Sequence, residues 1–279
     1  MKPAPFVYID PVSVKEVLAA LGAQDGEAAV LAGGQSLVPL LNLRLARPSL
    51  VVDLRRVTEL RDVTLSHTHL VVGAMVTTAQ LAAHPQVGAC GAGLREALLH
   101  IGHPQIRNRG TVGGSIAHAD PAAELPAVLV ALDGWVELAG PPGRREVAAA
   151  DFFTGPFDTA RRPDEIVTAV AFPRFTGSST TIELAPRHGD FALAGAFVAL
   201  DADGDARIAL FGVAERPVRA GEAERLVRAC GTASEVGEAV TAALSPADDV
   251  HASGRYRAHV AGVLVRRALD TLRTTGAAA

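Results

Sequence analysis

Two stretches of this chain decide its fold: GHPQIRNRGTVGGSIAHADP at residues 102–121, and AGGQSLVP at residues 32–39. Each contains a glycine pair, Gly33-Gly34 or Gly113-Gly114, with a serine soon after it. Paired glycines permit a sharp turn whose consecutive N–H groups, with a nearby hydroxyl, form an anion-binding concavity. Either pair alone is also typical of a tight turn or a bulge. Two segments of similar build together favour one shared anionic ligand, such as a dinucleotide pyrophosphate.

The common nucleotide-binding and hydrolase motifs are missing. The chain has no GxGxxG after a strand and no GxxxxGK[ST]. The segment Gly34-Gln35-Ser36 continues with Leu37-Val38 and does not complete GxSxG. A Rossmann site, a P-loop and a hydrolase nucleophile elbow are therefore disfavoured.

Composition excludes several other classes. With 279 residues, 49% hydrophobic, 20% charged and a net charge of −4, the chain has the profile of a globular protein of two or three subdomains. The slightly acidic balance argues against a nucleic-acid partner. No apolar run approaches the roughly 20 residues of a membrane span, and no secretory signal is evident, so a cytoplasmic location is expected.

Cysteine and histidine usage argues against metal binding. Cys90 and Cys230 are the only cysteines and have no C-x-x-C spacing, so this chain alone cannot hold a four-cysteine iron–sulfur cluster or a structural zinc. The histidine pairs 67/69 and 100/103 have no accompanying carboxylate and are interpreted as surface or loop residues. We expect no metal site.

Hydrophobic patterning divides the chain into three units, 1–60, 61–173 and 178–279. The first is a β-α-β unit with a capped helix starting at Ser13 and parallel strands. The second is α+β with a hairpin, and the third has three strands followed by helices. The expected strands lie at 6–9, 28–32, 50–54, 64–66, 70–72, 135–138, 166–172, 180–186, 193–201 and 206–213. The expected helices lie at 13–21, 77–83, 88–101, 121–132, 221–230, 232–243 and 254–273.

Polar residues just after the second glycine pair are candidates for ligand contacts. His118, Asp120 and Glu124 follow it closely and could reach the sugar or base of whatever binds there. Glu124 is equally well explained as an acid in the first turn of a helix, which the helix dipole favours.

Four blocks in order, 32–39, 102–121, RHGDFA at 187–192 and DVHASGRYR at 249–257 with RRAL at 266–269, resemble the FAD-binding medium subunit of the molybdenum hydroxylases. That family includes flavin subunits of carbon monoxide, xanthine and nicotine dehydrogenases. The resemblance implies an α+β, PCMH-type FAD-binding fold of two subdomains. A C-terminal domain with a three-stranded antiparallel sheet and a helical bundle follows.

The resemblance also implies which residues contact FAD. Segments 32–37 and 111–115 would cradle the pyrophosphate, Glu124 would lie near the adenosine ribose, and the loop at Asp190-Phe191 would approach the flavin ring. The full set of implied cofactor contacts is Ala32, Gly33, Gly34, Gln35, Ser36, Leu37, Ile101, Thr111, Val112, Gly113, Gly114, Ser115, His118, Asp120, Glu124, Val167, Asp190 and Phe191.

Three residues depart from the family pattern. Ser115 stands where asparagine is commoner, and Phe191 where many members have tyrosine. Glu183 stands at a position often held by lysine. If it points inward, an acid there should lower the flavin reduction potential, and if it faces solvent it should have little effect.

As implied by the family, the chain is an oxidoreductase subunit without catalytic side chains of its own. It would pass electrons from the [2Fe–2S] clusters of a small subunit through FAD to an external acceptor. A large molybdopterin subunit would oxidise the substrate, in a heterotrimer or a dimer of heterotrimers. The alternative is a stand-alone FAD-dependent oxidase or dehydrogenase with His188 as its base. A binding module without redox turnover would require degenerate FAD motifs, and both are intact.

Overall fold

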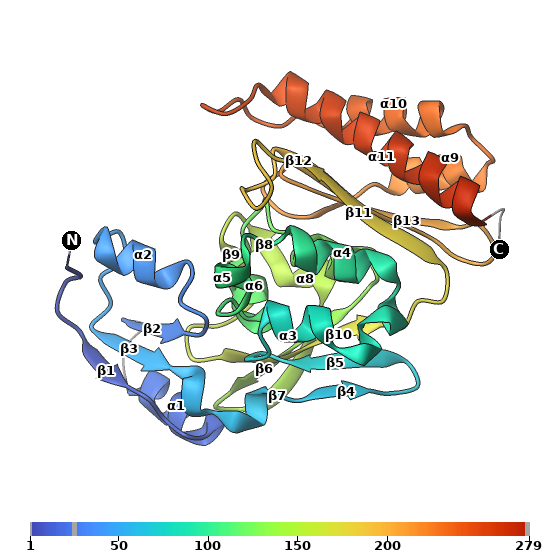
Figure 1. Cartoon of the computed structure of the whole chain (residues 1–279). Helices are drawn as coiled ribbons and strands as arrows, with labels where there is room; N and C mark the ends of the chain where they lie inside the picture. The colour runs from blue at the N-terminus through green and yellow to red at the C-terminus, as the bar shows by residue number, and fades with distance from the viewer. Residues whose placement is uncertain (1, 24–26, 277–279) are drawn as a thin grey trace.

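The first unit is a small parallel sheet with a helix on it. The computed structural model describes residues 2–23 and 27–276 (Figure 1). Strands β1 (Val7–Ile9), β2 (Ala28–Leu31) and β3 (Leu50–Asp53) pair in the order β1-β3-β2, all parallel. Helix α1 (Val14–Gly22) begins where the Ser13 hydroxyl accepts the Glu16 N–H, as the sequence predicts. The short helix α2 (Leu37–Asn42) follows the first glycine pair.

The second unit is a five-stranded antiparallel sheet in the order β4-β5-β10-β6-β7. The predicted hairpin is β4 (Val63–Leu65) with β5 (His69–Gly73), and the predicted strands at 135–138 and 166–172 are β6 (Trp135–Gly140) and β10 (Ile166–Pro173). The edge strand β7 (Gly143–Ala148) was not predicted. Its Arg-Arg-Glu sequence has no apolar alternation, because an edge strand can pair through its backbone and leave its side chains in water.

Helices cover this sheet and separate it from the third unit. They are α3 (Thr78–Ala83), α4 (Ala92–His100), α5 (Pro104–Arg107), α6 (Val112–His118), α7 (Glu124–Ala131) and α8 (Ala149–Phe152). A small hairpin, β8 (Phe153–Gly155) with β9 (Asp158–Thr159), follows them. Every residue of α7 is buried, which places this helix at the centre of the molecule.

The third unit is an antiparallel sheet that is buried on both faces. Strands β11 (Ser178–Leu184), β12 (Ala194–Leu200) and β13 (Ala206–Phe211) match the expectation, but β14 (Val218–Arg219) makes the sheet four-stranded instead of three-stranded. Two residues are too few to show a strand period in the sequence. Helices α9 (Gly221–Arg228), α10 (Ala233–Ala243) and α11 (Gly254–Gly276) lie over the sheet (Figure 1).

Strand β12 shows how the second and third units are joined. Phe197 and Ala199 belong to the hydrophobic core that contains α4 and α7, whereas Ala196 and Val198 belong to the core under α10 and α11. Successive side chains of a strand point to opposite faces, so one strand contributes to both cores. Within the described residues, no helix is long and apolar enough to cross a membrane.

Candidate functional site

One large cavity lies where the three units meet. Its volume is about 1790 Å³, and its walls come from residues 28–37, 101–124, 154–167 and 186–193, with further residues of the third unit. Pockets for drug-sized ligands measure roughly 300–1,000 Å³, so this cavity suits a larger, extended ligand.

The two glycine motifs pack against each other at the cavity wall. A Cβ atom on Gly33 would lie 2.3 Å from the backbone oxygen of Arg109 and 2.8 Å from the Cα of Gly110. A Cβ on Gly114 would lie 3.4 Å from that of Ala32. Only glycine at position 33 permits this approach, so the two motifs lie directly against each other.

The first motif offers backbone donors to a ligand. Gly34 has a positive φ of 75°, and the Gln35 side chain donates to the Gly33 carbonyl, which together shape the turn before α2. Among the described residues, the backbone N–H groups of residues 33–36 have no hydrogen-bond partner. Consecutive free N–H groups in such a turn form an anion-binding concavity.

The second motif differs from its expected form. It begins helix α6, with the Thr111 hydroxyl accepting the Gly114 N–H at 3.0 Å. The Val112 N–H donates to the Val76 carbonyl at 2.9 Å, and the Gly113 N–H donates to the Ala74 carbonyl at 3.0 Å. These donors are already used within the protein, so the second motif contributes side chains and close backbone packing, and no row of free N–H groups.

Val112 is a core residue and not a wall residue. Its side chain is fully buried, and its N–H is bonded to Val76. Val112 therefore does not line the cavity. The other implied contacts all line the cavity: Ala32, Gly33, Gly34, Gln35, Ser36, Leu37, Ile101, Thr111, Gly113, Gly114, Ser115, His118, Asp120, Glu124, Val167, Asp190 and Phe191.

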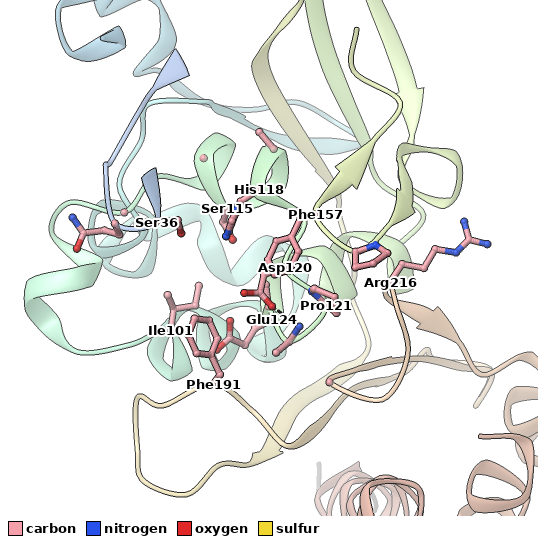
Figure 2. A pocket seen from close by; sticks show the side chains of 18 of the residues that line it. Ser36, Ile101, Ser115, His118, Asp120, Pro121, Glu124, Phe157, Phe191 and Arg216 are labelled. Carbon is pink, nitrogen blue, oxygen red and sulfur yellow. Dashed lines mark hydrogen bonds between the residues drawn. The ribbon is translucent and has the colours of Figure 1, made fainter. Parts of the chain in front are cut away.

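Sequence reasoning missed one aromatic wall of the cavity. Phe157, in the turn between β8 and β9, is 59% exposed and packs its ring 5.0 Å from the ring of His118 (Figure 2). Arg161 also lines the cavity nearby. The sequence around Phe157 holds no motif, and only the contact with His118 shows its place.

Phe191, Ile101 and Glu124 also line the cavity and are labelled in Figure 2. Phe191 is 73% exposed, and the neighbouring Asp190 carboxylate is held by Arg187 at 3.1 Å. Glu124, the first residue of α7, is only 8% exposed. Burial and, after it, the charge of Glu183 raise the pKa of Glu124 to about 8.

The structure settles the orientation of Glu183, which faces inward. Its side chain is 4% exposed, and Oε1 lies 3.3 Å from Nδ1 of His100. This hydrogen bond raises the pKa of His100. His188 lies beside them, with its ring 6.3 Å from that of His100, but it is exposed and is not part of the cavity wall.

Among the described residues, no cluster of three or more His, Cys, Asp or Glu side chains could hold a metal ion. The cavity instead combines free backbone donors, serine hydroxyls, aromatic side chains and the buried acids Glu124 and Glu165. That combination suits a large cofactor that carries a pyrophosphate and an aromatic ring system.

Comparison with known proteins identifies the class as flavoprotein subunits. Residues 4–175 match the family described as FAD binding domain in molybdopterin dehydrogenase. Residues 182–272 match the CO dehydrogenase flavoprotein C-terminal domain.

Three related proteins are similar to this chain over nearly its whole length. The 6-hydroxypseudooxynicotine dehydrogenase complex subunit alpha of Paenarthrobacter nicotinovorans is 40% identical, over 96% of this chain and 95% of its own. The carbon monoxide dehydrogenase medium chain of Hydrogenophaga pseudoflava is 38% identical, over 97% and 98%. The crystal structure of quinoline 2-oxidoreductase from Pseudomonas putida 86 superposes with a TM-score of 0.93 at 37% identity, covering 99% of each chain.

The chain belongs to the FAD-binding medium subunits of the molybdenum hydroxylases, and FAD is its cofactor. It is an oxidoreductase subunit with the PCMH-type fold and C-terminal domain that the sequence motifs predict.

Proposed function

We propose that this chain carries electrons from the [2Fe–2S] clusters of a small partner subunit, through FAD in the central cavity, to an external acceptor. A large molybdopterin subunit would oxidise the substrate in the same heterotrimer, or dimer of heterotrimers. The observation that carries the proposal is the meeting of both glycine motifs in one cavity, in a chain whose two cysteines cannot hold a cluster.

The first motif has the donors that the cofactor's pyrophosphate requires. The N–H groups of residues 33–36 and the Ser36 hydroxyl line the cavity, and Gly33 permits the close packing that shapes this wall. Ser115, shorter than the asparagine that is commoner at its position, would add a hydroxyl. A buried anion bound to several preorganised N–H groups needs no neutralising lysine.

We assign the opposite part of the cavity to the flavin ring. Ile101 and Phe191 offer apolar surface there, and Phe191 retains a ring contact without the tyrosine hydroxyl. Glu124 lines the same cavity and interacts with His100, the residue before Ile101, so we propose that it contacts the flavin portion in place of the adenosine ribose. Bound FAD supplies the redox chemistry, and the protein binds it, orients it and leaves one edge accessible.

The three units expected at 1–60, 61–173 and 178–279 fit this assignment. Each contains one of the three larger sheets, the second also holds the β8-β9 hairpin, and the cavity walls come from all three. We propose that the first two hold the cofactor and that the third closes over the ring.

Cofactor binding is tested with a matched glycine pair. In Gly33→Ala the new Cβ meets the Arg109 backbone, whereas in Gly221→Ala, at the start of α9, it meets nothing within 4 Å. After FAD is added and the unbound excess removed, we expect visible flavin absorbance in the wild type and Gly221→Ala, and at least a tenfold weaker FAD affinity in Gly33→Ala. Equal affinity in all three would contradict the assignment of the first motif.

The electron route is tested on the complex purified through a tag on this chain. We expect iron and molybdenum to co-purify, and chemical reduction of the iron–sulfur subunit to bleach the flavin absorbance. A chain that purifies alone and oxidises a substrate by itself would support the stand-alone alternative. His188, the base which that alternative needs, is outside the cavity wall.

A further inference from the structure

Three titratable side chains from separate elements meet behind the wall of the cavity. Glu124 comes from the start of α7, Glu183 from β11 and His100 from the end of α4. Glu124 lines the cavity, while Glu183 and His100 lie behind it. The Glu124 and Glu183 side chains are buried, and the His100 imidazole is 29% exposed.

The second acid lacks a full set of partners. Oε1 of Glu183 contacts Nδ1 of His100 at 3.3 Å, but Oε2 is buried without a hydrogen-bond partner in the described part of the chain. A buried carboxylate oxygen without a donor is costly, so such groups need a proton or a compensating charge nearby.

The surroundings decide where a proton resides. Burial and the Glu183 charge raise the pKa of Glu124 to about 8, Asp120 adds to the rise, and His100 and the Glu124 backbone N–H oppose it. The Glu183 hydrogen bond raises the pKa of His100, opposed by burial and supported by the Thr181 backbone. His188 faces His100 from the loop after β11. Near neutral pH, Glu124 therefore holds a proton.

We propose that Glu124, Glu183 and His100 form one proton-holding unit that presents Glu124 to the cavity as a neutral carboxylic acid, which donates a hydrogen bond to the flavin portion of FAD. The inference rests on the proposed function for the placement of the ring. Glu183 acts as a positioning residue, because its charge favours the proton on Glu124. His100 contacts Oε1 of Glu183 and so holds that acid in place. Neither side chain lines the cavity.

The unit makes cofactor affinity depend on pH. Once Glu124 ionises, it can only accept hydrogen bonds and faces the Glu183 charge across buried protein. If only the protonated form binds FAD well, the apparent dissociation constant rises up to about tenfold per pH unit above the midpoint. A glutamine at position 124 still donates but cannot ionise.

The first test uses the protein without FAD. We expect an infrared C=O stretching band of a protonated carboxylic acid at pH 7 that disappears with a midpoint near the pKa of about 8. The band should be absent from Glu124→Gln and unchanged in Glu146→Gln, an exposed carboxyl on β7. In Glu183→Gln the midpoint should fall, because the neighbouring charge is gone. A wild type without the band, or a band that survives in Glu124→Gln, would overturn the proton-holding unit.

The second test measures FAD affinity by quenching of flavin fluorescence between pH 6 and 9. We expect weakening above pH 8 in the wild type and Glu146→Gln, and flat, tight binding in Glu124→Gln. A wild-type affinity that does not change with pH would overturn the hydrogen bond to the cofactor. If the wild type bound no FAD at any pH, the proposed function would fail together with that hydrogen bond, while the infrared result would still decide the protonation state.

Discussion

Two buried glutamates line the same cavity in opposite electrostatic surroundings. Glu165 is 3% exposed and accepts two hydrogen bonds from Arg145, at 2.7 and 2.8 Å, and one from the Arg162 N–H at 2.8 Å. Glu124 is 8% exposed and faces a second acid, Glu183. Arg145 lowers the pKa of Glu165, whereas burial and Glu183 raise that of Glu124.

The difference separates a structural acid from a functional one. Glu165 has a partner for each oxygen, and its charge ties β7 to the turn before β10. Glu124 is held where its charge is disfavoured, the arrangement in which a carboxyl can keep a proton at neutral pH. Burial alone therefore does not identify the residue that works with the cofactor, but its neighbours do.

The largest expected effect comes from breaking the ion pair between Arg145 and Glu165. Arg145→Ala leaves the Glu165 carboxylate buried without its cation, which should lower the free energy of unfolding by about 3–5 kcal/mol. Urea unfolding measures this effect. The neighbouring Arg144→Ala is the control, because its ion pair with Glu137 leaves the Arg144 side chain 56% exposed and should contribute about 0–1 kcal/mol. Equal losses of stability in Arg145→Ala and Arg144→Ala would contradict a special role for the ion pair with buried Glu165.

The pH dependence of the free energy of unfolding tests the raised pKa of Glu124, which has no arginine partner. The pKa of Glu124 is about 8 when folded and 4.5 in its ordinary state, so between these pH values the folded chain holds a proton that the unfolded chain has released. The free energy of unfolding should therefore fall with rising pH, by up to about 1.4 kcal/mol per unit.

Comparing Glu124→Gln with the wild type isolates this slope from other groups. Between pH 6 and 8 the stability of the variant relative to the wild type should rise by about 2 kcal/mol. Glu165 has the opposite sign: its lowered pKa gives stability that is lost as the pH falls below its ordinary range. A constant difference between variant and wild type would refute the raised pKa of Glu124.

The smallest effect on stability is expected from the exposed ion pair between Arg187 and Asp190 at the edge of the cavity. Arg187 holds Asp190 with an ion pair whose arginine side chain is 85% exposed. Exposed pairs contribute little, so Arg187→Ala should change the free energy of unfolding by less than about 1 kcal/mol. Thermal unfolding in low and high salt measures this change. A larger loss would mean that the Arg187–Asp190 pair stabilises the loop more than an exposed ion pair should.

Much of the fold could be predicted from local pattern. Ser13 capping α1, the parallel strands of the first unit and the apolar run of β12 all follow from residues close in sequence. The second glycine motif was predicted as a turn, but Thr111 caps a helix there, and backbone carbonyls from the segment after β5 take its first N–H groups. Those partners lie far away in sequence.

The sequence by itself determined the family and the cofactor, because these depend on motifs, and its two cysteines are too few for a four-cysteine iron–sulfur cluster. Only the tertiary structure decided that Val112 belongs to the core, that Phe157 forms part of the cavity wall, and that Glu183 turns inward to His100. The raised pKa of Glu124 also depends on the tertiary structure. A pKa is set by burial and by neighbouring charges, and here folding brings those charges together from α4, α7 and β11, which are far apart in the sequence.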